Sequence, residues 1–157
     1  MMTERWENES LEHLVQRRLD YLQKILPDTI SAMIHLEMIQ CDEANNHYVM
    51  KGKTAPWMMN FHGTLHGGLC ATFMDQAMGH MAFCLKPGPG TTSTIDLNIK
   101  YHRPLLCDED ILLHIHRVSQ TKSLISMACE AYRACEPEKI CISATATFFY
   151  KPGAKHL

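Results

Sequence analysis

The stretch HGTLHGGLCATFMDQAMGHMAF, from His62 to Phe83, decides the fold of this chain. Residues 66–85 form the longest run of helix-favouring residues, and KPGPG then closes the run with two prolines and two glycines. Leu, Ala, Phe and Met occupy nearly every side of the helix that this run predicts. Such a helix is expected to be buried on nearly every side, so the rest of the chain must cover it.

The residues after this helix alternate between apolar and polar side chains, which is typical of β-strands. The alternation predicts about four strands, within residues 93–101, 111–116, 124–134 and 140–148. Before the helix, the runs SAMIHLEMIQ and HYVMKGK predict a hairpin around the turn-rich CDEANN. The chain thus offers enough strands to wrap one helix.

An amphipathic helix is predicted ahead of the hairpin, at about residues 10–26. Its apolar residues recur at helical spacing, Ser10 is a suitable N-cap, and Pro27 is a suitable stop. Together these elements predict an α+β domain in which an antiparallel β-sheet wraps a long central helix, with an extra N-terminal helix. The 157 residues and 46% hydrophobic content fit a single domain over residues 1–157, with its core at about 30–151.

The charge balance and the cysteines limit the classes of partner and the compartment. The 15 Lys and Arg against 17 Asp and Glu give a formal net charge of -2, so no basic field is expected for nucleic acid or an anionic membrane. Small molecules and other subunits are the expected partners. Seven cysteines without a C-x-x-C pair, most of them inside apolar runs, predict reduced and buried thiols. A polar amino terminus and no membrane-length apolar run predict a cytoplasmic protein.

One carboxylate, Asp75, interrupts the apolar central helix. It belongs to a small and polar stripe at i, i+3 and i+4 steps, which also holds Gly68, Thr72, Gln76 and Gly79. Because an unpaired buried carboxylate is costly, its presence needs a reason. Two interpretations stay open: a hydrogen bond to a neighbouring Thr or amide, with the glycines allowing close packing, or a role as catalytic base or nucleophile.

The start of the same helix offers a second candidate group. The HGG sequence leaves the N–H of Gly67 without an intrahelical partner, at the positive end of the helix dipole, where it suits an oxyanion hole. Gly67 and Asp75 are eight residues apart, which is about 12 Å along a helix. One reacting carbonyl cannot contact both. Either one group is not catalytic, or Gly67 of one subunit works with Asp75 of the partner subunit across a two-fold axis.

Three features occur in order along the chain: Asn60 followed by GTLHGG, an Asp eight residues after the first glycine of the GG pair, and TSTIDLNIKYHRP. Over roughly residues 55–150, this order resembles the hotdog-fold acyl-CoA thioesterases, in particular the PaaI-like branch of the phenylacetate-degradation type. The resemblance implies a long helix wrapped by an antiparallel sheet. It also implies a homodimer with one continuous sheet, and often a homotetramer.

The same resemblance implies hydrolysis of an acyl-CoA, with an aryl or a short to medium acyl group, to free acid and coenzyme A. The Gly67 amide would polarise the thioester carbonyl, and Asp75 of the partner subunit would activate water or attack directly. Asn60 would hold the thioester or the water, and His66 would shape the loop before the helix. No cofactor is implied beyond the coenzyme A of the substrate.

Further site residues follow from the resemblance. Thr94 matches a Ser or Thr that orients the water, and its phase opposite Ile95 predicts a side chain directed away from the packed face of the strand. Lys122 and Ser123 of SQTKS stand where the family binds the nucleotide, although the usual Gly-Arg/Lys-Thr pattern is altered. Gly68 and Arg103 complete the expected contacts with the substrate.

Two other functions stay open: a non-catalytic acyl-CoA-binding or sensor protein, and a hotdog enoyl-CoA hydratase or dehydratase. The HGG ahead of a downstream Asp favours hydrolysis. A metal centre is not expected, because no H-E-x-x-H occurs, His62 and His66 fall in a loop, and His114 and His116 have no third ligand near them in sequence.

Overall fold

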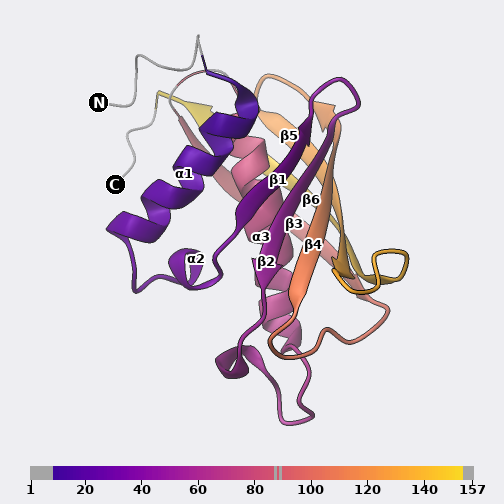
Figure 1. Cartoon of the computed structure of the whole chain (residues 1–157). Helices are drawn as coiled ribbons and strands as arrows, with labels where there is room; N and C mark the ends of the chain where they lie inside the picture. The colour runs from indigo at the N-terminus through magenta and orange to yellow at the C-terminus, as the bar shows by residue number, and fades with distance from the viewer. Residues whose placement is uncertain (1–8, 87, 89, 154–157) are drawn as a thin grey trace.

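The computed structural model describes residues 9–86, 88 and 90–153. One antiparallel six-stranded sheet curves around a long helix, as Figure 1 shows. The order along the sheet is β1-β2-β4-β5-β6-β3, so β1 and β3 form its two edges. The strands are β1 (Glu37–Asp42), β2 (His47–Lys53), β3 (Gly90–Tyr101), β4 (Asp110–Gln120), β5 (Leu124–Arg133) and β6 (Ile140–Pro152). This architecture confirms the predicted α+β class.

The long helix α3 (Gly67–Cys84) packs on the inner face of the sheet, where its apolar side chains meet those of the strands. Its N-cap is His66, and the chain leaves the helix at Leu85, so the predicted helix over residues 66–85 is confirmed. Ten of its residues are buried: Cys70, Phe73, Met74, Ala77, Met78, His80, Met81, Ala82, Phe83 and Cys84. The core of the molecule therefore lies between α3 and the sheet.

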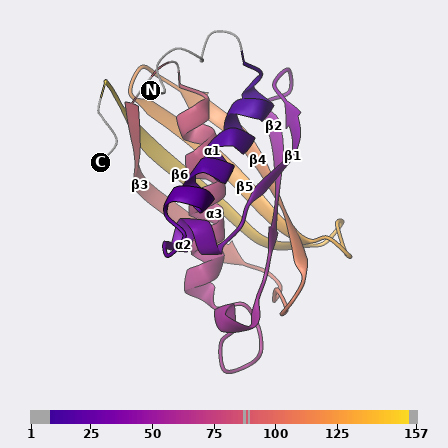
Figure 2. The ribbon, with the colours of Figure 1, turned by 60° about the vertical axis from the view of Figure 1, so that its left-hand side comes forward.

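The amino-terminal helix α1 (Leu11–Ile25) lies on the same side of the sheet as α3, in front of it in Figure 2. The Ser10 hydroxyl caps it by accepting a hydrogen bond from the His13 N–H at 3.3 Å. Its buried stripe, formed by Leu11, Leu14, Val15 and Leu19, follows the helical spacing read from the sequence. The predicted helix at residues 10–26 is thus confirmed.

The first strand of the predicted hairpin is shorter than its apolar run. Residues Ile30–Met33 form one helical turn, α2, and β1 begins only at Glu37. Ala32 and Ile34 are buried in the core, and His35 has a positive φ of 44°, which interrupts an extended chain. The SAMI segment therefore turns the chain from α1 into the edge strand, and its assignment to a strand was wrong.

The other strands confirm the predicted ones and extend beyond most of them. β3 pairs with β6 along its whole length, with one irregularity: Thr94 faces Phe148 and Asp96 faces Thr147, so Ile95 has no partner. Ile95 is the extra residue of a β-bulge, and its side chain is 57% exposed. Among the described residues, no strand pairs with the outer edge of β3.

All seven cysteines are free thiols, and four of them, Cys70, Cys84, Cys129 and Cys141, are buried. Burial raises the pKa of the Cys70 thiol to about 11, which keeps that sulfur protonated and unreactive at neutral pH. Cys135 is exposed, so burial was expected too broadly. Of the helices in the described part of the chain, none combines the length and the apolar character needed to cross a membrane.

Candidate active site

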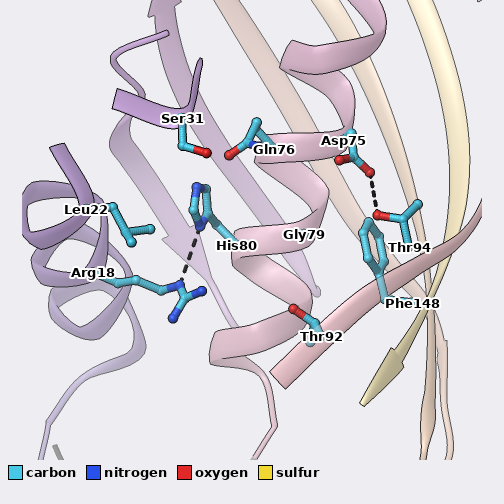
Figure 3. Close-up of a pocket in the computed structure, with 10 residues that line it drawn as sticks. All are labelled: Arg18, Leu22, Ser31, Asp75, Gln76, Gly79, His80, Thr92, Thr94 and Phe148. Carbon is cyan, nitrogen blue, oxygen red and sulfur yellow. Dashed lines mark hydrogen bonds between the residues drawn. The ribbon is translucent and has the colours of Figure 1, made fainter. Parts of the chain in front are cut away.

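Asp75 stands on the face of α3 that turns toward β3, and it accepts a hydrogen bond there. The Thr94 hydroxyl donates to its Oδ1 at 2.8 Å, as the close-up in Figure 3 shows. Asp75 itself is half-buried, as are Gln76 and Gly79 in the same stripe. The expectation that α3 is covered on nearly every side is therefore wrong for this stripe, because the rest of the described chain leaves it partly open.

Thr94 reaches Asp75 because of the bulge at Ile95. Without the extra residue, Thr94 and Leu97 would project from opposite faces of β3, since side chains alternate along a strand. The bulge shifts the phase by one, so Thr94 faces α3 while Leu97 also packs against the core. The prediction that Thr94 points away from the packed face was therefore wrong, and its role in orienting water stays a prediction.

The close-packing interpretation of the stripe also finds support. A Cβ added at Gly79 would lie 3.3 Å from Phe148 Cε1, closer than most such contacts, so the glycine allows β6 to approach the helix. The Asp75–Thr94 hydrogen bond is likewise the contact that a purely structural role would produce. Within the part of the chain that the structure describes, these contacts hold Asp75 in place without using its second carboxylate oxygen, which stays available for chemistry.

Gly67 opens α3, and its N–H has no acceptor within the described residues. Its carbonyl oxygen accepts a hydrogen bond from the Tyr101 hydroxyl at 2.9 Å, which anchors the helix start to the end of β3. A Cβ at Gly67 would meet Tyr101 Oη at 3.7 Å, an ordinary contact. Packing inside the chain therefore does not require a glycine here, whereas access of a ligand to the N–H does benefit from one.

His66 caps the helix. Its Nδ1 accepts a hydrogen bond from the Gly68 N–H at 3.1 Å, and its own N–H donates to the Met58 carbonyl at 2.9 Å. With Nδ1 as acceptor, the proton of the neutral ring lies on Nε2. The cap occupies the N–H of Gly68 and leaves the N–H of Gly67 as the first free donor of the helix. His66 thus lies at the loop–helix junction where the sequence placed it.

Asn60 braces the loop that leads into α3. Its Oδ1 accepts hydrogen bonds from the N–H groups of His62 at 2.9 Å and Thr64 at 3.2 Å, and its Nδ2 donates to Thr64 Oγ1 at 2.9 Å. Both ends of the amide are therefore engaged inside the loop. One Nδ2 hydrogen remains for a substrate or water.

A cavity of about 270 Å³ opens beside Asp75, between α3, α1 and β3. Figure 3 shows Asp75 and Thr94 on one side of it and Arg18, His80 and Ser31 on the other. Its wall is formed by Arg18, Leu22, Ser31, Asp75, Gln76, Gly79, His80, Thr92, Thr94 and Phe148. The candidate acid therefore stands at the edge of a space large enough for a small organic group.

Arg18 and His80 form a contact within this cavity wall. Arg18 Nε donates to His80 Nδ1 at 3.4 Å, and the guanidinium carbon lies 3.5 Å from the centre of the Phe83 ring. Burial, with a smaller contribution from the nearby Arg18 charge, lowers the pKa of His80 to about 3, so the imidazole is neutral at physiological pH. Burial also lowers the pKa of Arg18, but a guanidinium stays charged.

Comparison with known proteins agrees with this arrangement. The family model of the thioesterase superfamily matches residues 62–139, which include the Gly67 helix start and Asp75. The segment from residue 62 to residue 139 is therefore similar to the thioesterase superfamily. Human acyl-coenzyme A thioesterase 13 is 41% identical over 66 residues, which are 41% of this chain and 46% of the relative. The chain thus matches less than half the length of this curated relative.

Solved structures extend the likeness in fold to nearly the whole chain. The Escherichia coli PaaI protein from the phenylacetic acid degradation operon superposes with a TM-score of 0.74 at 16% identity, covering 92% of this chain and 99% of PaaI. A hypothetical thioesterase from Streptococcus pneumoniae, solved with coenzyme A, gives a TM-score of 0.66 at 21% identity, covering 77% and 92%. These likenesses establish the hotdog fold.

The residues expected to bind coenzyme A separate into two groups in the structure. Arg103 follows β3, close in sequence to the Tyr101 that contacts Gly67, and its Nη1 donates to the Ile140 carbonyl at 3.1 Å. Lys122 and Ser123 instead lie in the β4–β5 turn, beyond the other end of α3, where Lys86 Nζ donates to the Lys122 carbonyl at 3.4 Å. Of these expected contacts, Gly68 and Arg103 therefore lie near the amino-terminal end of α3 in one subunit, whereas Lys122 and Ser123 do not.

Sequence reasoning missed Arg18 and His80. His80 follows Gln76 by four residues, so the stripe of Asp75 could have been extended to it. Arg18 occurs seven residues after Leu11, on the apolar stripe of α1, which is an unusual place for a cation. No pattern in the sequence links α1 to Asp75, because only the tertiary fold brings them together.

His114 and His116 on β4 lie beside a third histidine, His47, on the neighbouring strand β2. His114 Nδ1 lies 3.1 Å from Nε2 of His47, whose ring also stacks on His116 with centroids 4.7 Å apart. Burial lowers the pKa values of His114 and His116. Among the described residues, no three His, Cys, Asp or Glu side chains are grouped as metal ligands, and the absence of a metal stays a prediction.

Proposed function

We propose that this protein is an acyl-CoA thioesterase that releases free acid and coenzyme A. The observation that carries the proposal is Asp75, held by the Thr94 hydroxyl at 2.8 Å on a partly open face of the central helix, beside a cavity. The thioesterase names of the relatives support the same activity. The coenzyme A bound to a protein of the same fold supports the substrate class.

A homodimer supplies the geometry that one subunit lacks. Asp75 and the free N–H of Gly67 are about 12 Å apart along α3, too far for one thioester. Two features would allow a two-fold dimer: the unpaired edge of β3, which could continue the sheet, and the partly open stripe of small residues on α3. Antiparallel packing of the two helices would bring Gly67 of one subunit to Asp75 of the partner subunit, twice.

The proposed reaction follows from these positions. The thioester oxygen accepts the hydrogen bond of the Gly67 N–H, which polarises the carbonyl. Asp75 of the partner subunit removes a proton from water as the water oxygen attacks the carbonyl carbon. The tetrahedral intermediate then collapses, its carbon–sulfur bond breaks, and the proton passes from the carboxyl group to the departing thiolate. The Thr94 oxygen, whose hydrogen is given to Asp75, can accept from the water and orient it.

The other proposed roles concern the surroundings of this site. Asn60 and His66 hold the loop that presents the Gly67 N–H. Arg103 and Gly68 contact the substrate from the Gly67 end, whereas Lys122 and Ser123 would contact the coenzyme A nucleotide only from another subunit. The domain spans residues 1–157, needs no cofactor, and works in the cytoplasm, where its free thiols would stay reduced.

Replacement of Asp75 tests the proposal. Asp75→Asn keeps the size of the side chain and can still bond Thr94, but it removes the base. We expect kcat to fall by about 10²–10⁴, measured by release of free thiol from a panel of acyl-CoA esters. Light scattering should show the same oligomer as for the unchanged protein. Full turnover by the variant would contradict the role of Asp75. Thermal stabilisation by acyl-CoA without thiol release by the unchanged protein would indicate a binding protein.

A further inference from the structure

The cavity beside Asp75 has a mainly polar wall. A site for a plain alkyl chain would be lined by apolar side chains. Here only Leu22, Gly79 and Phe148 are apolar among the residues that line it. The side facing Asp75 instead carries Arg18, Ser31 and the buried His80, as Figure 3 shows. The end of the cavity opposite Asp75 therefore suits a ligand group that forms hydrogen bonds.

Arg18 gives this end a positive charge. Among the described residues, Arg18 donates one hydrogen bond to the neutral His80 and lies over the face of the Phe83 ring, and no carboxylate lies within ion-pair distance of it. A guanidinium has five N–H groups, so most of its donors remain available to a ligand. Removing a cation from water without a counterion is unfavourable, and an anion that enters the cavity would offset that cost.

His80 fixes the direction of the guanidinium. It is 8% exposed, and it is neutral, with Nδ1 engaged as the acceptor for Arg18 Nε. The contact therefore orients the Arg18 side chain without cancelling its charge. The Arg18 guanidinium also packs on the face of the Phe83 ring. Arg18 is thus held in one position inside the cavity.

The distance between the two ends of the cavity limits the ligand. Asp75 and His80 are five positions apart on α3, which is about 7.5 Å along the helix axis. In the proposed reaction the thioester carbon lies at Asp75, so the acyl chain extends from there along Gly79 toward Arg18. A chain of about six carbons spans such a distance.

We propose that Arg18, oriented by His80, selects acyl-CoA esters whose acyl group ends in a carboxylate, such as the monothioesters of short dicarboxylic acids. The inference rests on the proposed thioesterase function and names its substrate class. Arg18 is a specificity residue that binds the far end of the acyl group, and it takes no part in breaking the thioester bond.

Adipyl-CoA and hexanoyl-CoA test this selection, because they have six-carbon acyl groups that differ only in the terminal carboxylate. A charge-assisted hydrogen bond is worth about tenfold to hundredfold in affinity. We expect kcat/KM for adipyl-CoA to exceed that for hexanoyl-CoA by at least tenfold. Arg18→Met, which keeps the apolar stem, should reduce this ratio by tenfold or more, and Arg18→Lys should restore part of it.

Arg17→Met is the matched control. Arg17 is the neighbour of Arg18 on α1, but it pairs with Glu9 at 2.7 Å and does not line the cavity. We expect its adipyl-CoA to hexanoyl-CoA ratio to equal that of the unchanged protein. An equal ratio in the Arg17 and Arg18 variants, or no preference for adipyl-CoA in the unchanged protein, would overturn the inference.

Binding to the Asp75→Asn protein separates this inference from the proposed function. By calorimetry, adipyl-CoA should bind at least tenfold more tightly than hexanoyl-CoA, and adding Arg18→Met should remove the difference. Equal affinities would overturn the selection by Arg18, even if the protein hydrolyses both esters. Selective binding with no thiol release by the unchanged protein would support the selection and contradict the thioesterase proposal.

Discussion

The Thr94 hydroxyl and the Asp75 carboxylate are the residue pair on which the proposed chemistry depends. The hydrogen bond of 2.8 Å fixes one carboxylate oxygen, and the other accepts no hydrogen bond from the described residues. The resemblance to hotdog thioesterases predicted both residues, but their contact depends on the bulge at Ile95. Nothing in TSTID indicates which residue is unpaired, because the bulge is set by pairing with β6, a strand more than forty residues further along the chain.

Thr94→Val tests this pair. Valine keeps the shape of the side chain but neither donates to Asp75 nor accepts from water, so the base and the water lose their alignment. We expect kcat to fall about tenfold to hundredfold with little change in KM, while Thr94→Ser keeps most of the activity. Steady-state kinetics measure both. A Thr94→Val protein with unchanged kcat would show that the hydrogen bond is structural only.

His80 makes the stability of the protein dependent on pH. Its pKa falls from 6.5 in the unfolded chain to about 3 in the folded protein, so the unfolded state binds more protons between these values. Stability is therefore full above about pH 6.5 and falls toward pH 3, by about 1.4 kcal/mol per pH unit. His114 and His116, whose pKa values burial also lowers, act in the same direction.

Chemical denaturation of the His80→Gln protein isolates this contribution. Between neutral pH and about pH 5, the unchanged protein should lose roughly 2 kcal/mol more of its unfolding free energy than the variant. The comparison cancels the other histidines and any pH-independent cost of the substitution. Parallel pH profiles for the two proteins would mean that His80 titrates normally in the folded state.

At the scale of elements, the start of α3 presents one N–H, that of Gly67, with no acceptor among the described residues. His66 occupies the N–H of Gly68, Tyr101 holds the carbonyl of Gly67, and Asn60 braces the preceding loop. The sequence predicted the bounds of α1 and α3 closely, because Ser10, Pro27 and KPGPG are strong local signals. It missed α2, whose four residues are set by tertiary packing of Ala32 and by the positive φ of His35.

Asn60→Ala should loosen this loop. The substitution removes acceptors for the N–H groups of His62 and Thr64, so both amides should exchange faster with deuterium. Because the loop sets the direction of the Gly67 N–H, we also expect a drop in kcat of about tenfold or more. Hydrogen exchange and thiol release measure the two effects. Unchanged exchange at residues 62 and 64 would contradict the bracing role.

At the scale of the whole molecule, the proposed function gives one chain two half-sites at different points of the same helix. The eight residues between Gly67 and Asp75 raised this alternative in the sequence, and the edge of β3 that no described strand pairs with adds support to it. The polar cavity was not predicted, because it combines α1, α2, α3, β3 and β6, and only the packed fold brings these elements together. A sequence pattern does not predict a cavity whose walls come from elements so far apart in the chain.

Complementation between two inactive subunits tests the composite site most directly. One subunit carries Asp75→Asn and the other Gly67→Pro, which removes the N–H at a first-turn position where proline fits a helix. His66 has a ψ of 134°, which suits a residue before proline. Each variant alone should lose about a hundredfold or more in kcat. Mixed dimers, isolated with two different tags, are then assayed for thiol release.

The composite account expects the mixed dimer to regain about half of the normal activity, because one of its two sites combines an intact Gly67 with an intact Asp75. As the matched control, one subunit carrying both substitutions is paired with an unchanged subunit, and this dimer should be inactive. The contradictory result is the reverse: no recovery in the mixed dimer and half activity in the control, which would place both groups of each site in a single subunit.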